Sequence, residues 1–472
     1  MTRIVIIGGG PAGYEAALVA AQYGADVTVV ERDAAGGACV LHDCVPSKTY
    51  LASAAAGAAL RRAAELGVQV DRERVELQVD VAAVHGRVKK LATAQSADVR
   101  ARLQREGVNL VTGTARLADE APGRALHRVA VTEPADGGPQ HSQWDAEVVL
   151  VATGATPRIL PDAQPDGERI LTWRQLYDLD ELPTDLVVVG SGVTGAEFVS
   201  AFTDFRVPVT LVSSRDRVLP GEDADAAAVL EEVFAERGVT LVKQARAQKV
   251  ERTADGVLVH LEDGRTVPGS HALMTVGSVP NTADLGLETA GLHTDRGGYL
   301  PVDRVSRTCA PGIYAAGGCT GLLPLASVAA MQGRTAIWHA LGEGVTPLRL
   351  KTVAAAVFTS PEIATVGISQ RAIDAGEVAA RTVMLPLATN PRAKMQELRR
   401  GFVKLFCRPA TGAVIGGVVV APLASELIAP TALAVQNNVT VEDLARTFAV
   451  YPSLSGSITE AGRQLMRHDD LD

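Results

Sequence analysis

The stretch RIVIIGGGPAG at residues 3–13 decides the fold of this chain. It joins an apolar run typical of a buried strand to a glycine turn and to the start of an Ala-rich helix. The GxGxxG spacing permits a tight turn, close approach of the backbone to a pyrophosphate, and packing of the helix on the strand. We expect the phosphates of a dinucleotide to face the N-terminus of this helix. The predicted binding residues are Gly8, Gly10, Pro11, Ala12 and Gly13.

A second apolar strand follows at 26–30 and ends in Glu31, which lies 18 positions after Gly13. About 20 residues normally separate this glycine motif from the acid that binds the ribose hydroxyls. We therefore predict that Glu31 binds the ribose of the first nucleotide.

The same pattern returns as DLVVVGSGVTG at residues 185–195, which predicts a second dinucleotide site. Each of the two units closes with another buried strand that ends in a glycine turn, at 149–157 and at 272–281. The binding residues predicted for the second fingerprint are Gly190, Gly192, Val193, Thr194 and Gly195.

The bulk composition excludes several classes of protein. The 472 residues carry 45 Lys and Arg against 54 Asp and Glu, a net charge of −9 that opposes nonspecific nucleic-acid binding. Only five cysteines occur, and those other than Cys39 and Cys44 are scattered, which argues against a secreted disulfide framework. No metal-ligand spacing is present, so we predict no metal site. The sequence shows no signal peptide and no apolar run long enough for a membrane span. We expect a cytoplasmic protein.

Two cysteines, Cys39 and Cys44, stand five positions apart within GGACVLHDCVPSK at residues 36–48. In a straight helix their Cα atoms are roughly 8 to 9 Å apart, beyond the roughly 7 Å limit for a disulfide. A bridge therefore needs distorted backbone, and Pro46 supplies a cause because it has no N–H for the carbonyl of His42. The alternative is two buried cysteines without a redox role.

The rest of the chain contains two regions with different sequence patterns. Helical periodicity without marked turns covers about 47–105. Beyond 350 the fingerprints stop, and apolar runs at 354–358, 401–407 and 414–420 predict antiparallel strands. Helices are expected at 424–437, at 441–448 and from about 455, in a domain that forms a dimer interface. The predicted fold class is α/β, with two Rossmann-like dinucleotide-binding domains and a C-terminal α+β dimerisation domain.

These motifs together resemble the flavoprotein disulfide reductases, which include lipoamide dehydrogenase and glutathione reductase. The resemblance covers nearly the whole chain in order. It rests also on the segments VGSVPNT at 276–282, IYAAG at 313–317 and VFTSPE at 357–362. It implies an FAD-binding domain at 1–160 and 275–350, an NAD(P)-binding domain at 161–274, an interface domain at 351–472, and a homodimer.

Roles for individual residues follow from the resemblance. It makes Cys44 the thiol beside the flavin, Cys39 the outer thiol, and Lys48 a cation near flavin N5 that pairs with Glu197. The alternative for Glu197 is an acid near a helix N-terminus. The resemblance also implies cofactor contacts at Gly37, Ala38, Lys48, Thr153, Gly154, Gly277 and Gly317, and at a helix that opens with Leu325 and Ala326.

The chain departs from the family pattern at its C-terminal end. The family carries a His-Pro-Thr segment with a Glu five positions after the His, and here the segment reads YPSLSG at 451–456. Tyr451 is a poor base at neutral pH because tyrosine has an ordinary pKa of about 10, and Gly456 has no carboxylate. General-base help is typically worth about 10²- to 10⁴-fold, so rapid dithiol exchange is not expected. Glu460 is interpreted as a solvated helix charge.

Two further departures concern the cofactors. Gly318 stands where the family has an Asp that accepts a hydrogen bond from the FAD ribityl chain, a loss of about 1 to 3 kcal/mol. In the second fingerprint the position that reads the ribose holds Ser213, and no carboxylate follows before Arg215. Arg215 or Arg217 can then pair with a 2′-phosphate, which permits NADPH as well as NADH. The alternative is two solvated arginines.

The leading hypothesis is an FAD-dependent NAD(P)H oxidoreductase that passes electrons to a quinone or similar small acceptor, because this reaction needs no histidine base. The sequence resembles a lipoamide-dehydrogenase-like quinone reductase subgroup of the family. The second hypothesis keeps Cys39 and Cys44 as a dithiol relay to a low-molecular-weight disulfide. The third is a non-catalytic flavoprotein or redox sensor.

Overall fold

The computed structural model describes residues 1–69, 78–118 and 126–466. They group into two compact units of interleaved sequence. The first unit comprises Met1–Thr49, His85–Arg158 and Gly277–Arg349, and the second comprises Tyr50–Val84, Ile159–Val276 and Leu350–Asp472. The described residues of the range 50–84, namely 50–69 and 78–84, group with the second unit, although the resemblance assigns them to the FAD-binding domain. The three domain boundaries given above stay a prediction.

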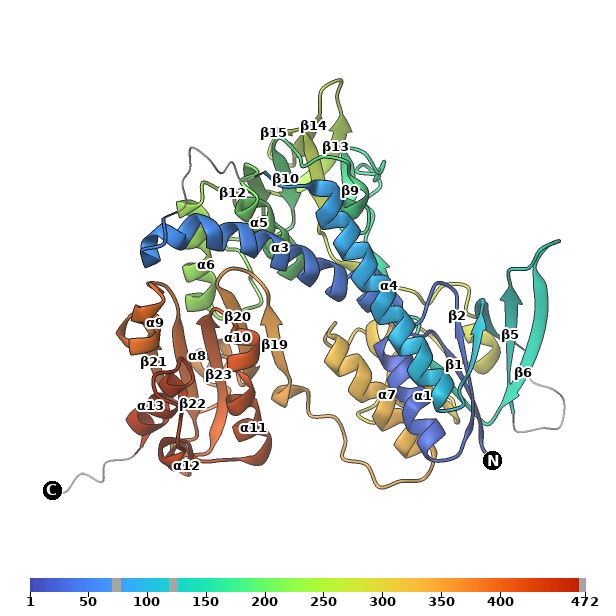
Figure 1. Cartoon of the computed structure of the whole chain (residues 1–472). Helices are drawn as coiled ribbons and strands as arrows, with labels where there is room; N and C mark the ends of the chain where they lie inside the picture. Colours follow the sequence, from blue (N-terminus) through green and yellow to red (C-terminus); the bar gives the residue numbers. More distant parts are fainter. Residues whose placement is uncertain (70–77, 119–125, 467–472) are drawn as a thin grey trace. The chain divides into compact units, whose positions relative to one another are not determined.

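A five-stranded parallel sheet forms the centre of unit 1 (Figure 1). Its order is β18-β7-β1-β2-β3. The strands are β1 (Arg3–Ile7), β2 (Asp26–Glu31), β3 (Asn109–Thr112), β7 (Val148–Val151) and β18 (Ile313–Ala315). The helices that begin or lie in this unit are α1 (Pro11–Gln22), α2 (Gly37–Leu41), α3 (Cys44–Arg62), α4 (Val81–Arg105) and α7 (Ala326–Ala340).

The apolar run of β1 reflects burial on both faces of the sheet. Ile4 and Ile6 pack in one core cluster with Ala16 of α1 and Ile337 of α7, and these two helices lie side by side (Figure 1). The alternate residues, such as Val5, belong to a second cluster with a three-stranded antiparallel sheet. That sheet consists of β4 (Thr114–Ala118), β5 (His127–Glu133) and β6 (Gln140–Ala146), and a short pair is formed by β8 (Ala155–Pro157) and β17 (Ser278–Pro280).

Unit 2 repeats the spatial strand arrangement of unit 1, except that its edge strand at Ile170–Thr172 comes first in the sequence of its sheet, whereas the matching edge strand β18 comes last. Its parallel sheet has the order β12-β11-β10-β16-β9, so β10, β11, β12, β16 and β9 correspond to β1, β2, β3, β7 and β18. The strands are β9 (Ile170–Thr172), β10 (Leu186–Val189), β11 (Val209–Val212), β12 (Thr240–Val242) and β16 (His271–Met274). Around them lie α5 (Val193–Asp204), α6 (Ala224–Glu236) and an antiparallel sheet of β13 (Ala247–Arg252), β14 (Val257–Leu261) and β15 (Thr266–Gly269).

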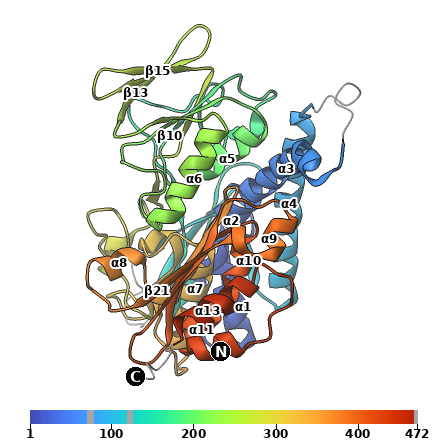
Figure 2. The ribbon, with the colours of Figure 1, turned by 90° about the vertical axis from the view of Figure 1, so that its left-hand side faces the viewer.

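The C-terminal part of unit 2 is an antiparallel sheet with the order β19-β20-β23-β22-β21. The predicted runs form β19 (Ala354–Val357), β22 (Phe402–Cys407) and β23 (Val414–Ala421), whereas β20 (Glu362–Gly367) and β21 (Arg381–Pro386) were not predicted. Helices α11 and α13 pack against β21, β22 and β23 (Figure 2). The helices are α8 (Gln370–Asp374), α9 (Pro391–Met395), α10 (Ala424–Leu427), α11 (Ala429–Asn437), α12 (Val441–Arg446) and α13 (Gly456–Leu465).

The predicted helical region at 47–105 contains α3 and α4, joined in part by a 3₁₀ turn at Ala63–Leu66. Within the described ranges, each helix is either too short or too polar to pass through a lipid bilayer.

Candidate functional site

The first glycine turn has the geometry that a dinucleotide site requires. A Cβ added to Gly8, whose φ is +107°, would lie 2.3 Å from the carbonyl oxygen of Ala152, and one added to Gly13 would lie 1.8 Å from the oxygen of Gly8. Both positions therefore need glycine so that β1, β7 and α1 can approach. A Cβ on Gly10, the N-cap of α1, would meet no atom within 4 Å. This opening before a twelve-residue helix, with Pro11 at its first position and Ala12 buried behind it, fits a pyrophosphate group.

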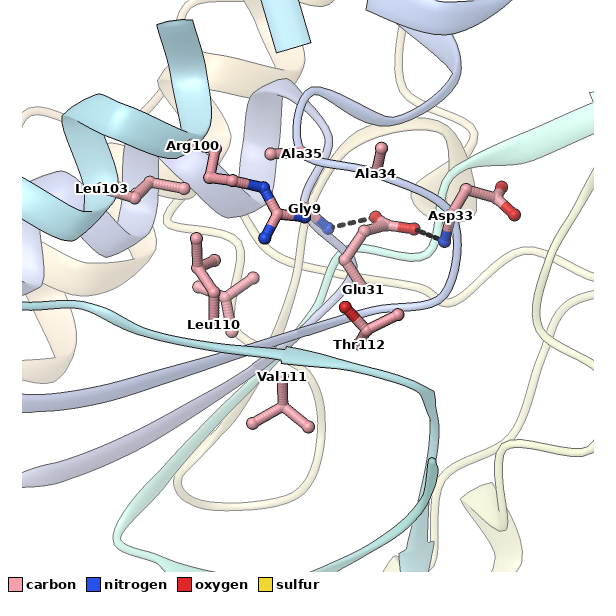
Figure 3. Close-up of a pocket in the computed structure, with 11 residues that line it drawn as sticks. Gly9, Glu31, Asp33, Ala34, Ala35, Arg100, Leu103, Leu110, Val111 and Thr112 are labelled. Atoms are coloured by element: carbon pink, nitrogen blue, oxygen red, sulfur yellow. Dashed lines mark hydrogen bonds between the residues drawn. The ribbon is translucent and has the colours of Figure 1, made fainter. Parts of the chain in front are cut away.

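Glu31 lies at the carboxyl end of β2 and closes one side of a pocket (Figure 3). Its Oε2 accepts a hydrogen bond of 2.6 Å from the N–H of Gly9, and its Oε1 accepts one of 2.9 Å from the N–H of Asp33. The carboxylate is thus held at the position predicted to bind ribose. The other lining residues, both apolar and polar, include Ala34, Ala35, Arg100, Leu103, Leu110, Val111 and Thr112.

The other residues predicted to bind FAD converge on the same edge of the sheet. A Cβ on Gly37 would lie 2.9 Å from the Cα of Gly10, and a Cβ on Gly317 would lie 3.5 Å from the Cβ of Ala12. Ala38 follows Gly37 in α2, and Leu325 is the N-cap of α7, which begins at Ala326. Thr153 donates a hydrogen bond of 2.7 Å to the carbonyl of Asn281.

Packing explains why position 318 holds glycine, which the sequence did not reveal. A Cβ at this position would lie 3.1 Å from the N of Ala155 and 3.2 Å from the carbonyl carbon of Gly154. An Asp would therefore have to push this backbone aside. The turn is held instead by Gln332, whose Oε1 accepts a hydrogen bond of 2.9 Å from the N–H of Gly317.

The backbone between the two cysteines is distorted, as a disulfide bridge requires. The distortion lies at His42 and not at Pro46. The helix α2 ends at Leu41, His42 has φ −133° and ψ −25°, and α3 begins at Cys44. Pro46 therefore lies in the first turn of α3, where a missing N–H costs no helical hydrogen bond. The break itself brings the side chains of Cys39 and Cys44 within hydrogen-bonding distance, and both are thiols here.

The hydrogen bond to Cys44 raises the pKa of the Cys39 thiol far above its ordinary value, and burial of Cys39 adds to the increase. The nearby charge of Asp43 acts in the same direction, whereas Lys48 acts against it. Cys39 consequently keeps its proton at neutral pH, because the thiolate is disfavoured by burial and by a neighbouring negative charge.

Lys48 follows in α3, with its Nζ 3.3 Å from the Oγ of Ser47. Glu197 is the fifth residue of α5 and is only 3% exposed, so it is a buried acid near the N-terminus of that helix. Its Oε1 accepts a hydrogen bond of 3.0 Å from the N–H of Phe358. The pairing of Lys48 with Glu197 stays a prediction.

The second glycine turn copies the first. A Cβ on Gly190, whose φ is +114°, would lie 2.4 Å from the carbonyl oxygen of Thr275, and one on Gly195 would lie 1.9 Å from the oxygen of Gly190. Gly192, the N-cap of α5, is open like Gly10, and Val193 and Thr194 begin the helix. Thr275 was not predicted, although its Oγ1 donates to the carbonyls of Val189 and Gly190 at 2.9 and 3.0 Å.

Gly277 is not part of the second glycine turn. It groups with unit 1, where its carbonyl accepts a hydrogen bond of 2.9 Å from the N–H of Arg158. The chain passes from β16 into β17, so the apolar run at 272–281 belongs to two sheets rather than to one closing strand.

Tyr451 is 81% exposed, and the neighbouring Phe448 and Val450 are exposed as well. Gly456 starts α13, and a Cβ there would touch only the Oγ of Ser453 at 3.5 Å. Glu460 pairs with Arg463 on the same helix at 2.6 Å, as its interpretation as a solvated helix charge predicts.

The chain is similar to a known protein family over nearly its whole length. Residues 2–333 match the model of the pyridine nucleotide-disulphide oxidoreductases, and residues 353–462 match the dimerisation domain of the same family. The chain belongs to the pyridine nucleotide-disulphide oxidoreductase family. This family uses FAD and NAD(P)H, so the predicted cofactor classes and the predicted flavin-dependent oxidoreductase are confirmed. The α/β fold class is confirmed, and the dimerisation domain supports a homodimer.

Similar family members are known in several organisms. An NAD(P)H dehydrogenase (quinone) of Mycobacterium tuberculosis is 67% identical over all of this chain and 95% of its own length. Dihydrolipoyl dehydrogenase 2 of Haloarcula marismortui is 34% identical over 98% of this chain and 96% of its own. The crystal structure of LpdA from Mycobacterium tuberculosis matches with a TM-score of 0.94 and 66% identity, over 99% of this chain and all of that one.

Proposed function

We propose that this protein is an FAD-dependent NAD(P)H oxidoreductase that passes electrons to a quinone in the cytoplasm. The M. tuberculosis relative named NAD(P)H dehydrogenase (quinone) supports this acceptor. The observation that carries the proposal is that Tyr451, followed by Gly456, stands at the place where the family carries its His and Glu. A phenol is a weaker base than the imidazole it replaces, so it does not relay thiol protons quickly.

The residues of the chain prepare two binding sites for this reaction. FAD held by these residues would supply the capacity to accept a hydride from NAD(P)H and to pass two electrons to the acceptor. Glu31 holds a ribose hydroxyl, and the open N-cap at Gly10 directs the N–H groups of α1 at the phosphates. Lys48 supplies positive charge on the helix that begins with Cys44.

The experiment that tests the proposal is Cys39→Ser in the purified holoenzyme. We expect NAD(P)H:quinone turnover to stay within about twofold of wild type, because electrons leave without the outer thiol. Cys309→Ser is the matched control, since Cys309 is an exposed cysteine outside the predicted site. Loss of quinone turnover in Cys39→Ser, with Cys309→Ser unaffected, would overturn the proposal.

One observation favours a second activity, the reduction of a low-molecular-weight disulfide. The hydrogen bond between Cys39 and Cys44 places the two sulfurs close enough for one to attack a disulfide and the other to resolve it. The same Cys39→Ser enzyme separates the two functions, because disulfide turnover must disappear while quinone turnover persists.

A further inference from the structure

The helices that follow the two glycine turns, α1 and α5, end in the same way but with different residues. Each helix is followed closely by a residue with a left-handed backbone, which is Gly24 with φ +72° after α1 and Arg206 with φ +65° after α5. In both turns the N–H of the next residue donates to a carbonyl five positions earlier, at 3.1 and 2.9 Å. Arginine therefore stands where this kind of helix end favours glycine.

The conformation of Arg206 is unfavourable for a residue with a Cβ atom. The helix α6 ends with the usual residue, because Gly238 has φ +80° there. The side chain of Arg206 is exposed, and it has neither a hydrogen bond nor an ion pair with a residue in the ranges 1–69, 78–118 and 126–466. The fold thus gains no polar contact in return for this backbone strain, which indicates a role outside the fold.

Two further arginines lie at the same end of α5. Arg61, near the end of α3, donates from Nη2 to the carbonyl oxygen of Asp204, the last residue of α5. Arg237, which follows α6, places its Nη1 3.1 Å from Oδ1 of Asp204 and donates from Nη2 to the carbonyl oxygen and Oγ of Ser360 at 3.0 and 3.1 Å. The ends of three helices therefore meet at this place within unit 2.

The three guanidinium groups face one carboxylate. Asp204 is 7% exposed, and burial raises the pKa of its carboxyl group. The pKa of Arg61 is lowered by burial and then by the charges of Arg206 and Arg237, so the guanidinium groups repel one another. Three positive charges against one negative charge leave an excess of two, which matches the charge of a phosphate dianion.

Guanidinium groups bind phosphate oxygens through a planar fork of N–H donors. We propose that Arg61, Arg206 and Arg237 form a binding site for a phosphate dianion, which is either free phosphate or the terminal group of a phosphate monoester. Neighbouring Arg62 is left out of the site because it pairs with Glu65 at 3.3 Å. The site lies about 18 Å along α5 from the second glycine turn, so it is separate from the nucleotide.

Calorimetric titration of inorganic phosphate into the holoenzyme tests this proposal. Saturating NAD⁺ fills the second nucleotide site, and chloride holds the ionic strength constant. We expect Arg206→Gly to weaken phosphate binding at least about tenfold, and Arg206→Lys to keep part of the affinity because it keeps the charge. Arg246→Ala is the matched control, since Arg246 is an exposed arginine paired with Glu262, and it should bind phosphate as wild type does.

A parallel titration with glycerol 3-phosphate distinguishes the two sources of the dianion. Tighter binding of inorganic phosphate supports a site for free phosphate, and tighter binding of glycerol 3-phosphate supports a site for a phosphate monoester.

The stability of Arg206→Gly separates a binding role from a structural role. In phosphate-free buffer its Tm should rise by about 1 to 2 °C, because glycine adopts the left-handed conformation freely and one of three like charges is gone. A lower Tm would show that the side chain serves the fold and would overturn the proposal. Absence of phosphate binding by wild type, or unchanged phosphate affinity in Arg206→Gly, would also overturn it, and each of these results leaves quinone reduction untouched.

Discussion

The hydrogen bond between Cys39 and Cys44 raises the pKa of the Cys39 thiol. Cys39 holds its proton because Cys44 and burial raise its pKa, and the distortion at His42 creates that contact. The spacing of the two cysteines is a property of the sequence, but the protonation of Cys39 depends on which atoms the broken helix brings together.

Cys44→Ala is expected to make Cys39 more reactive. Removal of the main cause lowers the pKa of Cys39 toward the ordinary thiol value of about 8.5, so its alkylation should begin at lower pH than in wild type. Iodoacetamide labelling of the prereduced enzyme, read by peptide mass spectrometry from pH 7 to 10, should show about a tenfold faster reaction of Cys39 at pH 8. Labelling in guanidinium controls for intrinsic reactivity, and an unchanged pH profile in the folded enzyme would refute the assignment.

At the scale of elements, the glycines in the turn between β1 and α1 have two different roles. Gly8 and Gly13 permit close packing, whereas Gly10 keeps the helix N-terminus open. In the second turn, Gly190 and Gly195 likewise permit close packing, and Gly192 keeps the helix N-terminus open. The same kind of turn is therefore present in both nucleotide sites.

Gly10→Ala should therefore lower FAD content without lowering the stability of the apoprotein, because the methyl group meets no atom of the chain within 4 Å. Gly13→Ala should unfold the β1–α1 turn, since its methyl group would overlap the oxygen of Gly8. Flavin absorbance of the purified proteins and circular dichroism during heating of the apoproteins measure the two effects. Full flavin content in Gly10→Ala would contradict this account of the turn.

On the scale of the whole molecule, unit 2 is held together by charges from distant parts of the sequence. Lys404 of β22 is 2% exposed, and its Nζ lies 2.8 Å from Asp223, the N-cap of α6, and 2.6 Å from Asp225. This ion cluster joins the C-terminal sheet to the helix that follows the second nucleotide site.

Lys404→Met should cost about 3 to 5 kcal/mol of unfolding free energy, because it leaves the carboxylate of Asp223 buried without its partner. Arg463→Ala removes an exposed ion pair with Glu460 and should cost less than about 1 kcal/mol. Urea unfolding of the holoenzyme at fixed protein concentration compares them. A similar small loss in both variants would show that the Lys404 cluster does not stabilise unit 2.

Local patterns were enough to predict the two glycine turns, the place of Glu31 at the end of β2, the strands β1 and β10, and the family. Each depends on neighbours in the sequence, and a backbone that must bind phosphate accepts few alternatives to glycine. The break at His42, the crowding at Gly318, the support from Gln332 and Thr275, and the buried Lys404 could not be predicted in this way. They arise from contacts between residues far apart in the chain, whose distances are set when the sheets and helices pack.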